Sequence, residues 1–135
     1  MGNRIKASTA RRDVLQSERR RAREVRELLR ARAMVVGSFV ELERKCGKAT
    51  CRCARGEKHS GNFLSRKSEG RTQLLYVPQR EAAEIALKAE RYRRFRQARA
   101  SLMKLGLETA QAADRLQAAL TERYPKEARR RRKRR

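Results

Sequence analysis

Two long stretches that favour helices flank a short region rich in β-branched and aromatic residues. Residues 8–33 contain no Gly or Pro and are dominated by Arg, Glu, Leu and Ala, most of which are strong helix formers. Apolar residues recur there at three-, four- and seven-residue spacing, namely Leu15, Ala22, Val25 and Leu29. We therefore expect a helix over 8–33, capped by Ser8 or Thr9, whose narrow apolar stripe needs a partner.

A second helix is predicted over residues 78–122. Pro78 suits its first position, because the N–H that proline lacks has no partner there. The apolar stripe of this helix comprises Ile85, Tyr92, Phe95, Leu102, Leu105, Ala112, Leu116 and Leu120. Gly106 is its weak point, because Gly costs about 1 kcal/mol relative to Ala in a helix, and it is a candidate break.

The region between the helices reads as a small sheet. Residues 34–44 are predicted to form a strand with Val36, Val40 and Leu42 on one side. Residues 61–78 predict two strands joined by a turn at Ser68-Glu69-Gly70, where Gly permits positive φ. The expected fold class is α+β, with two long helices, a three-stranded antiparallel sheet and a Cys-rich loop in one domain over 1–125.

Charge is the strongest indication of function. The chain has 38 Lys and Arg against 15 Asp and Glu, a formal net charge of +23. The excess is spread over residues 11–32, 79–125 and the last ten residues. Nucleic acid is the commonest partner of such a chain, because Lys and Arg release condensed counterions from phosphate. A merely solvated charged surface is the plain alternative. An anionic membrane is a weaker one, because no helix has a bulky apolar face with Trp or Phe anchors.

The basic residues divide into helix, loop and tail positions. Residues 126–135 have no apolar pattern, so we expect a tail that is disordered when unbound. The candidate phosphate-contacting residues are Lys45, Lys48, Arg52, Arg55, Arg91, Arg94, Arg129, Arg130, Arg131, Arg132, Lys133, Arg134 and Arg135. Such contacts do not read base sequence, so DNA and RNA both remain open.

The segment "KCGKATCRCARGEKH" holds all three cysteines and the only histidine. Cys46, Cys51, Cys53 and His59 form a C-x4-C-x-C-x5-H pattern, and zinc favours such thiolate and imidazole ligands in a closed tetrahedron. C-x-C is tighter than the usual C-x2-C knuckle, which counts against zinc. The alternatives are thiols that line a turn as small hydrophobes and, third, redox chemistry, for which a C-x-x-C motif is missing.

These residues resemble a family of short uncharacterised bacterial proteins. The shared pattern is S-x-V-E, then C-G-K-x-x-C-x-C, a histidine, a hairpin and a Val-Pro helix start. In this chain it comprises Ser38, Val40, Glu41, Cys46, Gly47, Lys48, Cys51, Cys53, His59, Val77 and Pro78. The chain departs from the family at "HSGNFLS", which lacks a Gly-Pro and a run of tyrosines. The resemblance implies a fold and a link to mobile elements, but no activity.

We expect a binding protein rather than an enzyme. One histidine excludes two-histidine metal nucleases, and no phosphate-binding loop of the G-x4-G-K-[ST] type is present. DNA is favoured over RNA through the mobile-element resemblance. The rival hypothesis is an adaptor that docks a protein partner, or a second copy, through its helices. No membrane span or signal-peptide stretch is evident, so the expected location is the bacterial cytoplasm.

Overall fold

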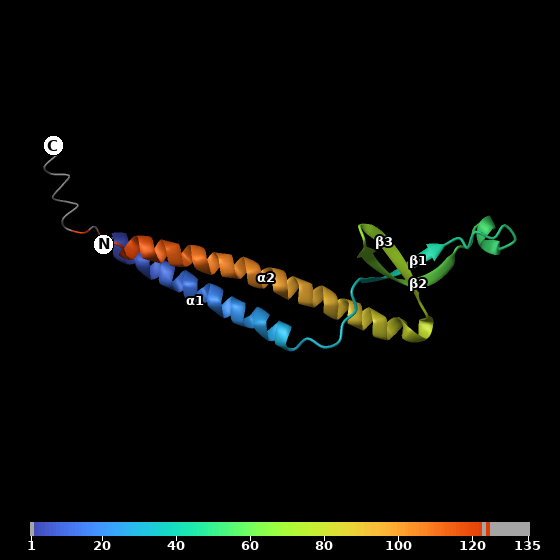
Figure 1. The fold of residues 1–135 in the computed structure, drawn as a ribbon, viewed down its shortest axis with the longest axis horizontal. Helices are drawn as coiled ribbons and strands as arrows, with labels where there is room; N and C mark the ends of the chain where they lie inside the picture. The colour runs from blue at the N-terminus through green and yellow to red at the C-terminus, as the bar shows by residue number, and fades with distance from the viewer. Residues whose placement is uncertain (1, 123, 125–135) are drawn as a thin grey trace, which may run out of the picture. The chain divides into compact units, whose positions relative to one another are not determined.

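The computed structural model describes residues 2–122 and 124, and it contains two long helices and one antiparallel sheet (Figure 1). The elements in chain order are α1 (Gly2–Leu29), β1 (Ser38–Arg44), η1 (Arg52–Arg55), β2 (His59–Ser68), β3 (Arg71–Val77), η2 (Gln79–Glu81) and α2 (Ala82–Leu120). The predicted α+β class, with a three-stranded sheet between long N- and C-terminal helices, is confirmed. The predicted basic tail at 126–135 lies outside the described residues.

The described chain groups into two compact units, and α2 contributes to both. One unit contains residues 2–26 and 100–122, and the other is Glu27–Arg99. Across the described residues, no helix combines the length and the apolar character that crossing a membrane requires.

The first unit is built on a seam of small side chains, which we call the helical seam. Its buried residues are Ala7, Ala10 and Ser17 of α1 and Leu105 and Ala112 of α2. They recur at intervals of three or seven residues, which keeps one face of each helix directed at the other. The Thr109 hydroxyl lies 2.8 Å from the Ser17 hydroxyl, so short side chains meet directly across the seam.

The apolar stripe predicted for the first helix is wrong at Leu15, Ala22 and Leu29, which are exposed, whereas Val25 is half-buried. Leu15 is 52% exposed and Leu29 is 80% exposed, whereas the alanines of the helical seam are buried. Leucine outranks alanine in hydrophobicity, but the buried alanines occupy the face that meets α2. The helix also starts at Gly2, so Ser8 and Thr9 lie inside it rather than at its cap, and it ends at Leu29.

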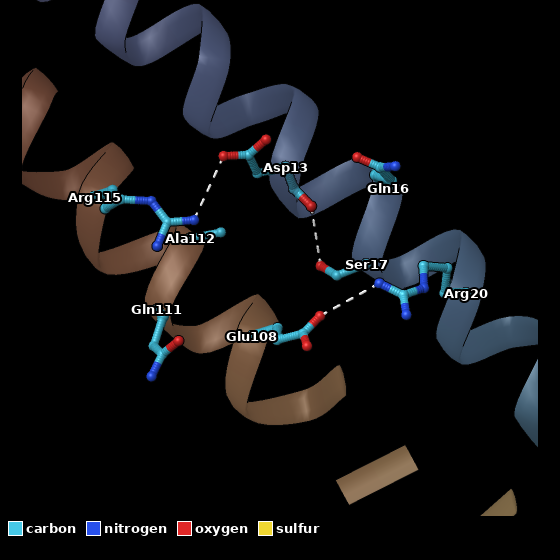
Figure 2. Close-up of a pocket in the computed structure, with 8 residues that line it drawn as sticks. All are labelled: Asp13, Gln16, Ser17, Arg20, Glu108, Gln111, Ala112 and Arg115. Carbon is cyan, nitrogen blue, oxygen red and sulfur yellow. Dashed lines mark hydrogen bonds and ion pairs between the residues drawn. The ribbon is translucent and has the colours of Figure 1, made fainter. Parts of the chain in front are cut away.

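Two ion pairs flank the helical seam. Arg115 lies 3.4 Å from Asp13, and Arg20 lies 3.6 Å from Glu108. These residues line an open groove of about 280 Å³ between the helices (Figure 2). The groove's charged groups therefore neutralise one another across the helix pair, as expected of a structural contact.

The break predicted at Gly106 is not observed. Helix α2 continues from Ala82 to Leu120, and Leu105 beside the glycine is buried. A cost of about 1 kcal/mol is smaller than the contribution of burying one leucine side chain, about 1.5–3 kcal/mol, so the helix persists.

The second unit contains the sheet, in the order β1-β2-β3. Its inner face packs on the first part of α2, where Leu64, Val77 and Ala89 form a small core with Val35, Phe39 and Ile85 around it. The predicted apolar side of the first strand is only partly correct. Val40 and Leu42 are half-buried in β1, but they alternate with the core residue Phe39, and Val36 precedes the strand and is 53% exposed.

The connections of the sheet follow the sequence closely. Glu69 and Gly70, with φ of 49° and 76°, form the two-residue turn between β2 and β3, as the sequence predicts. Positive φ at both turn residues matches the twist of antiparallel hairpins. Pro78 caps η2 rather than starting α2, so the long helix begins at Ala82.

Candidate metal centre

The pairing of β1 and β2 brings the two ends of the cysteine segment together. Arg44, the last residue of β1, lies opposite His59, the first residue of β2. Residues 45–58, which we call the cysteine connection, therefore leave the sheet and return to it at the same place. This closure positions Cys46 near His59, although twelve residues separate them in the sequence.

Local turns direct the two central cysteines toward the same point. Gly47 has φ of 80°, a left-handed conformation that glycine adopts without strain. Cys51 N–H donates to the Lys48 carbonyl (3.1 Å) and Ala54 N–H donates to the Cys51 carbonyl (3.0 Å), which starts η1. Cys51 has extended backbone and Cys53 lies in η1, so their side chains do not follow one regular alternation. The tight C-x-C spacing, which counted against zinc, therefore does not keep the two sulfurs from lying near one point.

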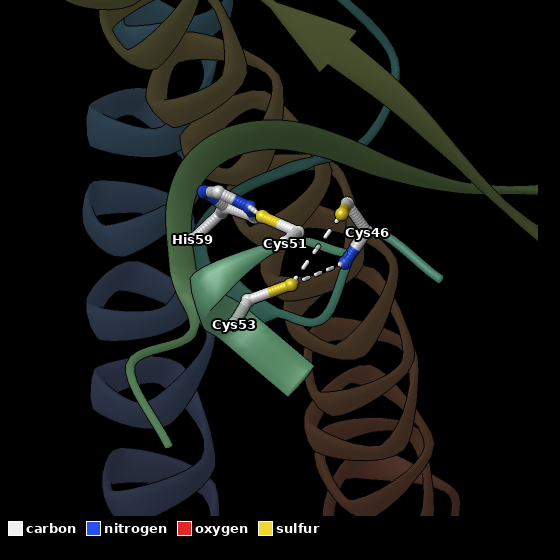
Figure 3. Close-up of side chains that lie close together, drawn as sticks. All are labelled: Cys46, Cys51, Cys53 and His59. Carbon is white, nitrogen blue, oxygen red and sulfur yellow. Dashed lines mark hydrogen bonds between the residues drawn. The ribbon is translucent and has the colours of Figure 1, made fainter. Parts of the chain in front are cut away.

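The four ligand atoms lie within 4.8 Å of one another (Figure 3). Cys51 Sγ is 3.0 Å from His59 Nε2, and Cys53 Sγ is 3.4 Å from Cys46 Sγ. Zinc–sulfur bonds of about 2.3 Å imply sulfur–sulfur edges of about 3.8 Å in a tetrahedral site, so the Cys53–Cys46 distance is slightly shorter than such an edge and the outer limit of 4.8 Å is longer. All three cysteines are free thiols, and their spacing far exceeds a disulfide bond of about 2.05 Å.

The environment favours a thiolate at Cys46. Its pKa is lowered to about 6, chiefly because the backbone N–H of Lys48 stabilises the thiolate, with further hydrogen bonds from Cys53, His59 and Cys51. The Cys46 backbone N–H also favours the Cys53 thiolate, but burial and the neighbouring thiols outweigh it and raise the pKa of Cys53. A cation among the sulfurs would offset the effects that raise the pKa of Cys53, because a metal-bound cysteine is a thiolate.

Exposure argues against thiols that serve only as small hydrophobes. Cys53 is buried (1% exposed), but Cys51 is half-buried and Cys46 and His59 are exposed. An apolar filler has no reason to gather around exposed imidazole. The arrangement is instead that of a ligand set that converges on one point.

Comparison with known families finds a family whose pattern the chain matches. Residues 14–87, more than half of its length, match the family described as "Domain of unknown function (DUF6788)". The protein belongs to the DUF6788 family. This confirms the expected membership of an uncharacterised family. Neither the curated proteins nor the solved structures include a significant match.

The DUF6788 match covers the whole candidate centre together with the basic residues around it. Lys45, Lys48, Arg52 and Arg55 are all exposed on the cysteine connection, and none has an ion-pair partner among the described residues. Three thiolates and one divalent cation carry a net charge of −1. The surrounding cations would offset that charge and leave an overall basic surface.

The two predicted phosphate-contacting residues of the second helix lie beyond the DUF6788 match. Arg91 is half-buried, and its Nη1 donates to the Ala33 carbonyl (3.2 Å), which fastens the segment after α1 to α2. Arg94 is exposed and pairs with Glu90 at 3.2 Å. The structure therefore gives both residues contacts within the protein, and it does not bring them to the cysteine connection. The seven predicted tail residues at 129–135 lie outside the described part.

A line of arginines on α1, which we call the arginine stripe, was missed by the sequence reading. Its members are Arg12, Arg19, Arg23 and Arg26. They are spaced by seven, four and three residues, which places them on one helix face, opposite the helical seam. All four are exposed, and the described ion pairs include none of them. The seven-, four- and three-residue spacing of these arginines is visible in the sequence, but only apolar residues were used to predict helix faces.

Proposed function

We propose that this DUF6788 protein is a non-enzymatic nucleic-acid-binding protein that contacts phosphates through its arginine-rich surface and holds one zinc ion at Cys46, Cys51, Cys53 and His59. DNA is favoured over RNA because the sequence resemblance includes proteins of mobile elements. The net charge of +23 supports a polyanionic partner.

The arginine stripe carries the nucleic-acid proposal. It extends over residues 12–26, about 21 Å at 1.5 Å per residue. Phosphates follow one another at about 3.4 Å of axial rise along each strand of a duplex, so the stripe is long enough to meet several of them. Its guanidinium groups are exposed and lack ion-pair partners among the described residues, so binding would not first break an internal contact. Contacts of this kind give affinity without base specificity.

The zinc proposal rests on the convergence of four ligand atoms within 4.8 Å. Three sulfurs and one imidazole nitrogen suit zinc better than hard cations, which prefer oxygen. The assignment gives the only histidine of the chain a structural role, and it leaves no histidine for acid–base chemistry.

A salt titration tests the nucleic-acid proposal. The stripe variant replaces Arg12, Arg19, Arg23 and Arg26 with Gln. The matched control replaces four exposed arginines that have ion-pair partners and are not candidate phosphate contacts, namely Arg20, Arg30, Arg80 and Arg93. Both variants lose four positive charges, so a purely bulk effect of charge would change them equally.

For duplex DNA, the slope of log K against log salt should fall by up to about 3.6 in the stripe variant, at about 0.9 per lost phosphate contact. The control should change the slope by less. Absence of binding at low salt, or binding that does not depend on salt, would overturn the proposal. An equal change in the two variants would remove the stripe from it.

A protein-docking adaptor is the second candidate, and one observation favours it. Leu15 and Leu29 are both exposed, and they are two helical heptads apart on α1. Exposed leucines at this spacing suit a partner helix or a second copy. Apolar docking of that kind would persist at high salt, whereas phosphate binding would not.

A further inference from the structure

The face of the sheet that points away from the core is aromatic and basic. In an antiparallel sheet, residues in register share a face, so Val40, Phe63 and Tyr76 lie together on it. Leu74 of β3 shares this face, with Arg44 at one end and Lys67 at the other. We call these six residues the outer sheet face. The acidic strand residues Glu41 and Glu43 alternate with them, so no acidic residue of the strands lies on this face.

Two aromatic rings form the centre of this face. Tyr76 is 68% exposed, and its ring lies 5.9 Å from that of Phe63 in an edge-to-face arrangement. Phe63 is held on two sides. Arg44 lies 5.6 Å from the centroid of its ring, and the ring covers Gly61 so closely that a Cβ there would come within 3.0 Å. A fixed Phe63 therefore supports a Tyr76 ring that remains largely open to solvent.

We propose that the outer sheet face binds unpaired nucleotides of single-stranded nucleic acid, with a base stacked on Tyr76 and phosphates near Arg44 and Lys67. This inference rests on the proposed nucleic-acid function and adds the class of ligand. The backbones of Arg44 and Lys67 each lie four residues along the sheet from the ring pair, about 13 Å at 3.3 Å per residue, and the Arg44 side chain reaches back so that its guanidinium lies over Phe63. Cations at both ends of an aromatic face match a strand whose bases are splayed onto the sheet.

The basic charge of the outer sheet face and its exposed ring argue against two other occupants, a second copy of the chain and duplex DNA. A second copy of the chain would place the same cations against each other, because this face carries Arg44 and Lys67 and no acidic strand residue. Duplex DNA keeps its bases stacked inside the helix, where Tyr76 cannot reach their faces. Single strands expose both the bases and the phosphates.

The experiment compares Tyr76→Ala with Tyr76→Phe, which keeps a ring, and with Leu75→Ala. Leu75 is the neighbouring residue, 40% exposed, and belongs to the other face of the sheet. The probes are fluorescein-labelled oligo-dT, oligo-rU and a duplex of equal length. Tyr76→Ala should weaken binding to the single strands about 5- to 150-fold, the range measured for loss of one stacked base. Duplex affinity should stay unchanged, and Tyr76→Phe and Leu75→Ala should behave like the unmodified protein.

A second variant keeps the test independent of folding losses. The chain contains no tryptophan, so Tyr76→Trp introduces a single reporter on this face. Saturable quenching of its fluorescence by oligo-dU or oligo-rU, which share one base, is expected, and the stronger of the two identifies the sugar preference.

The outcomes separate the two proposals. If no nucleic acid binds at low salt, the proposed function itself fails. If duplex DNA binds but Tyr76→Ala leaves single-strand affinity unchanged, or lowers both affinities equally, the stacking inference alone is wrong. A concentration-dependent dimer that Tyr76→Ala abolishes would also overturn it, in favour of a second copy on this face.

Discussion

The cysteine connection and the helical seam differ in how their residues are buried. Along the seam, Ala7, Ala10, Ser17, Leu105 and Ala112 are each at most 5% exposed and recur at helical spacing. Within residues 45–58, Cys53 is the one buried residue, and nearly all of its neighbours are exposed. Apolar burial stabilises a structure in proportion to the area removed from water, so burial contributes directly to holding the helices of the seam together.

The cysteine connection has no comparable apolar contacts. Its turns, its two glycines with positive φ and its four convergent ligand atoms fix a shape for which burial alone gives little free energy. A bound metal ion would supply that free energy, because formation of such a site is coupled to local folding. The comparison teaches that burial, which accounts for the helical seam, does not account for the shape of the cysteine connection.

The largest expected effect comes from metal removal, which should loosen the cysteine connection and leave the helical seam unchanged. A zinc chelator should increase amide hydrogen exchange by orders of magnitude in residues 45–58, because the ligands then lose their common partner. Exchange in the helical seam should remain unchanged. Hydrogen exchange followed by mass spectrometry measures both regions in one sample. Unchanged exchange in the connection would show that its turns are stable without a metal ion.

A smaller effect is expected from overpacking the helical seam. Ala112 is 1% exposed and borders the groove between the helices, so the atoms that Ala112→Leu adds must press against α1 or enter the groove between its ion pairs, and the free energy of unfolding should fall by about 1–3 kcal/mol. Ala113→Leu, at the exposed neighbouring position, is the matched control and should change stability little. Denaturant unfolding gives the two values, and metal content should not differ between the variants. Equal stabilities would mean that the seam is loosely packed.

The smallest effect concerns a carboxylate of α2 that lies outside both regions. Glu90 on α2 has its pKa lowered to about 2, first by its hydrogen bond with Arg93 and then by Arg94, with burial opposing. A depressed carboxyl pKa stabilises the folded state above the ordinary value of 4.5, and that contribution disappears as the pH falls from 4.5 toward 2. Glu90→Gln should therefore lower the melting temperature slightly at pH 7 and leave it unchanged near pH 2. A larger difference at low pH would contradict the assignment.

Much of the fold was predictable because its signals are local. The Gly- and Pro-free stretch, the two-residue turn at Glu69-Gly70 and the β-branched strands each depend on neighbouring residues. The buried face of α1 was not predictable from hydrophobicity, because alanines pack against α2 while Leu15 and Leu29 face solvent. Which face a helix buries depends on its partner, and the sequence of one helix does not contain that information.

The candidate centre was predictable as a set of ligands but not as a geometry. The C-x4-C-x-C-x5-H spacing named all four residues that converge. Relief of the tight C-x-C spacing depends on the extended backbone at Cys51 and the turn of η1, and closure depends on the pairing of Arg44 with His59. The aromatic pair on the outer sheet face was likewise hidden, because Phe63 and Tyr76 meet only through strand register.

Metal content tests most directly the claim that the cysteine connection is held by a metal ion. The full chain should be purified under reducing conditions without added metal and measured by elemental analysis, together with Cys53→Ser and a count of free thiols. We predict one zinc ion per chain in the unmodified protein and almost none in Cys53→Ser. An unmodified protein with three reactive thiols that contains no bound metal, and takes up none when zinc is offered, would contradict the claim.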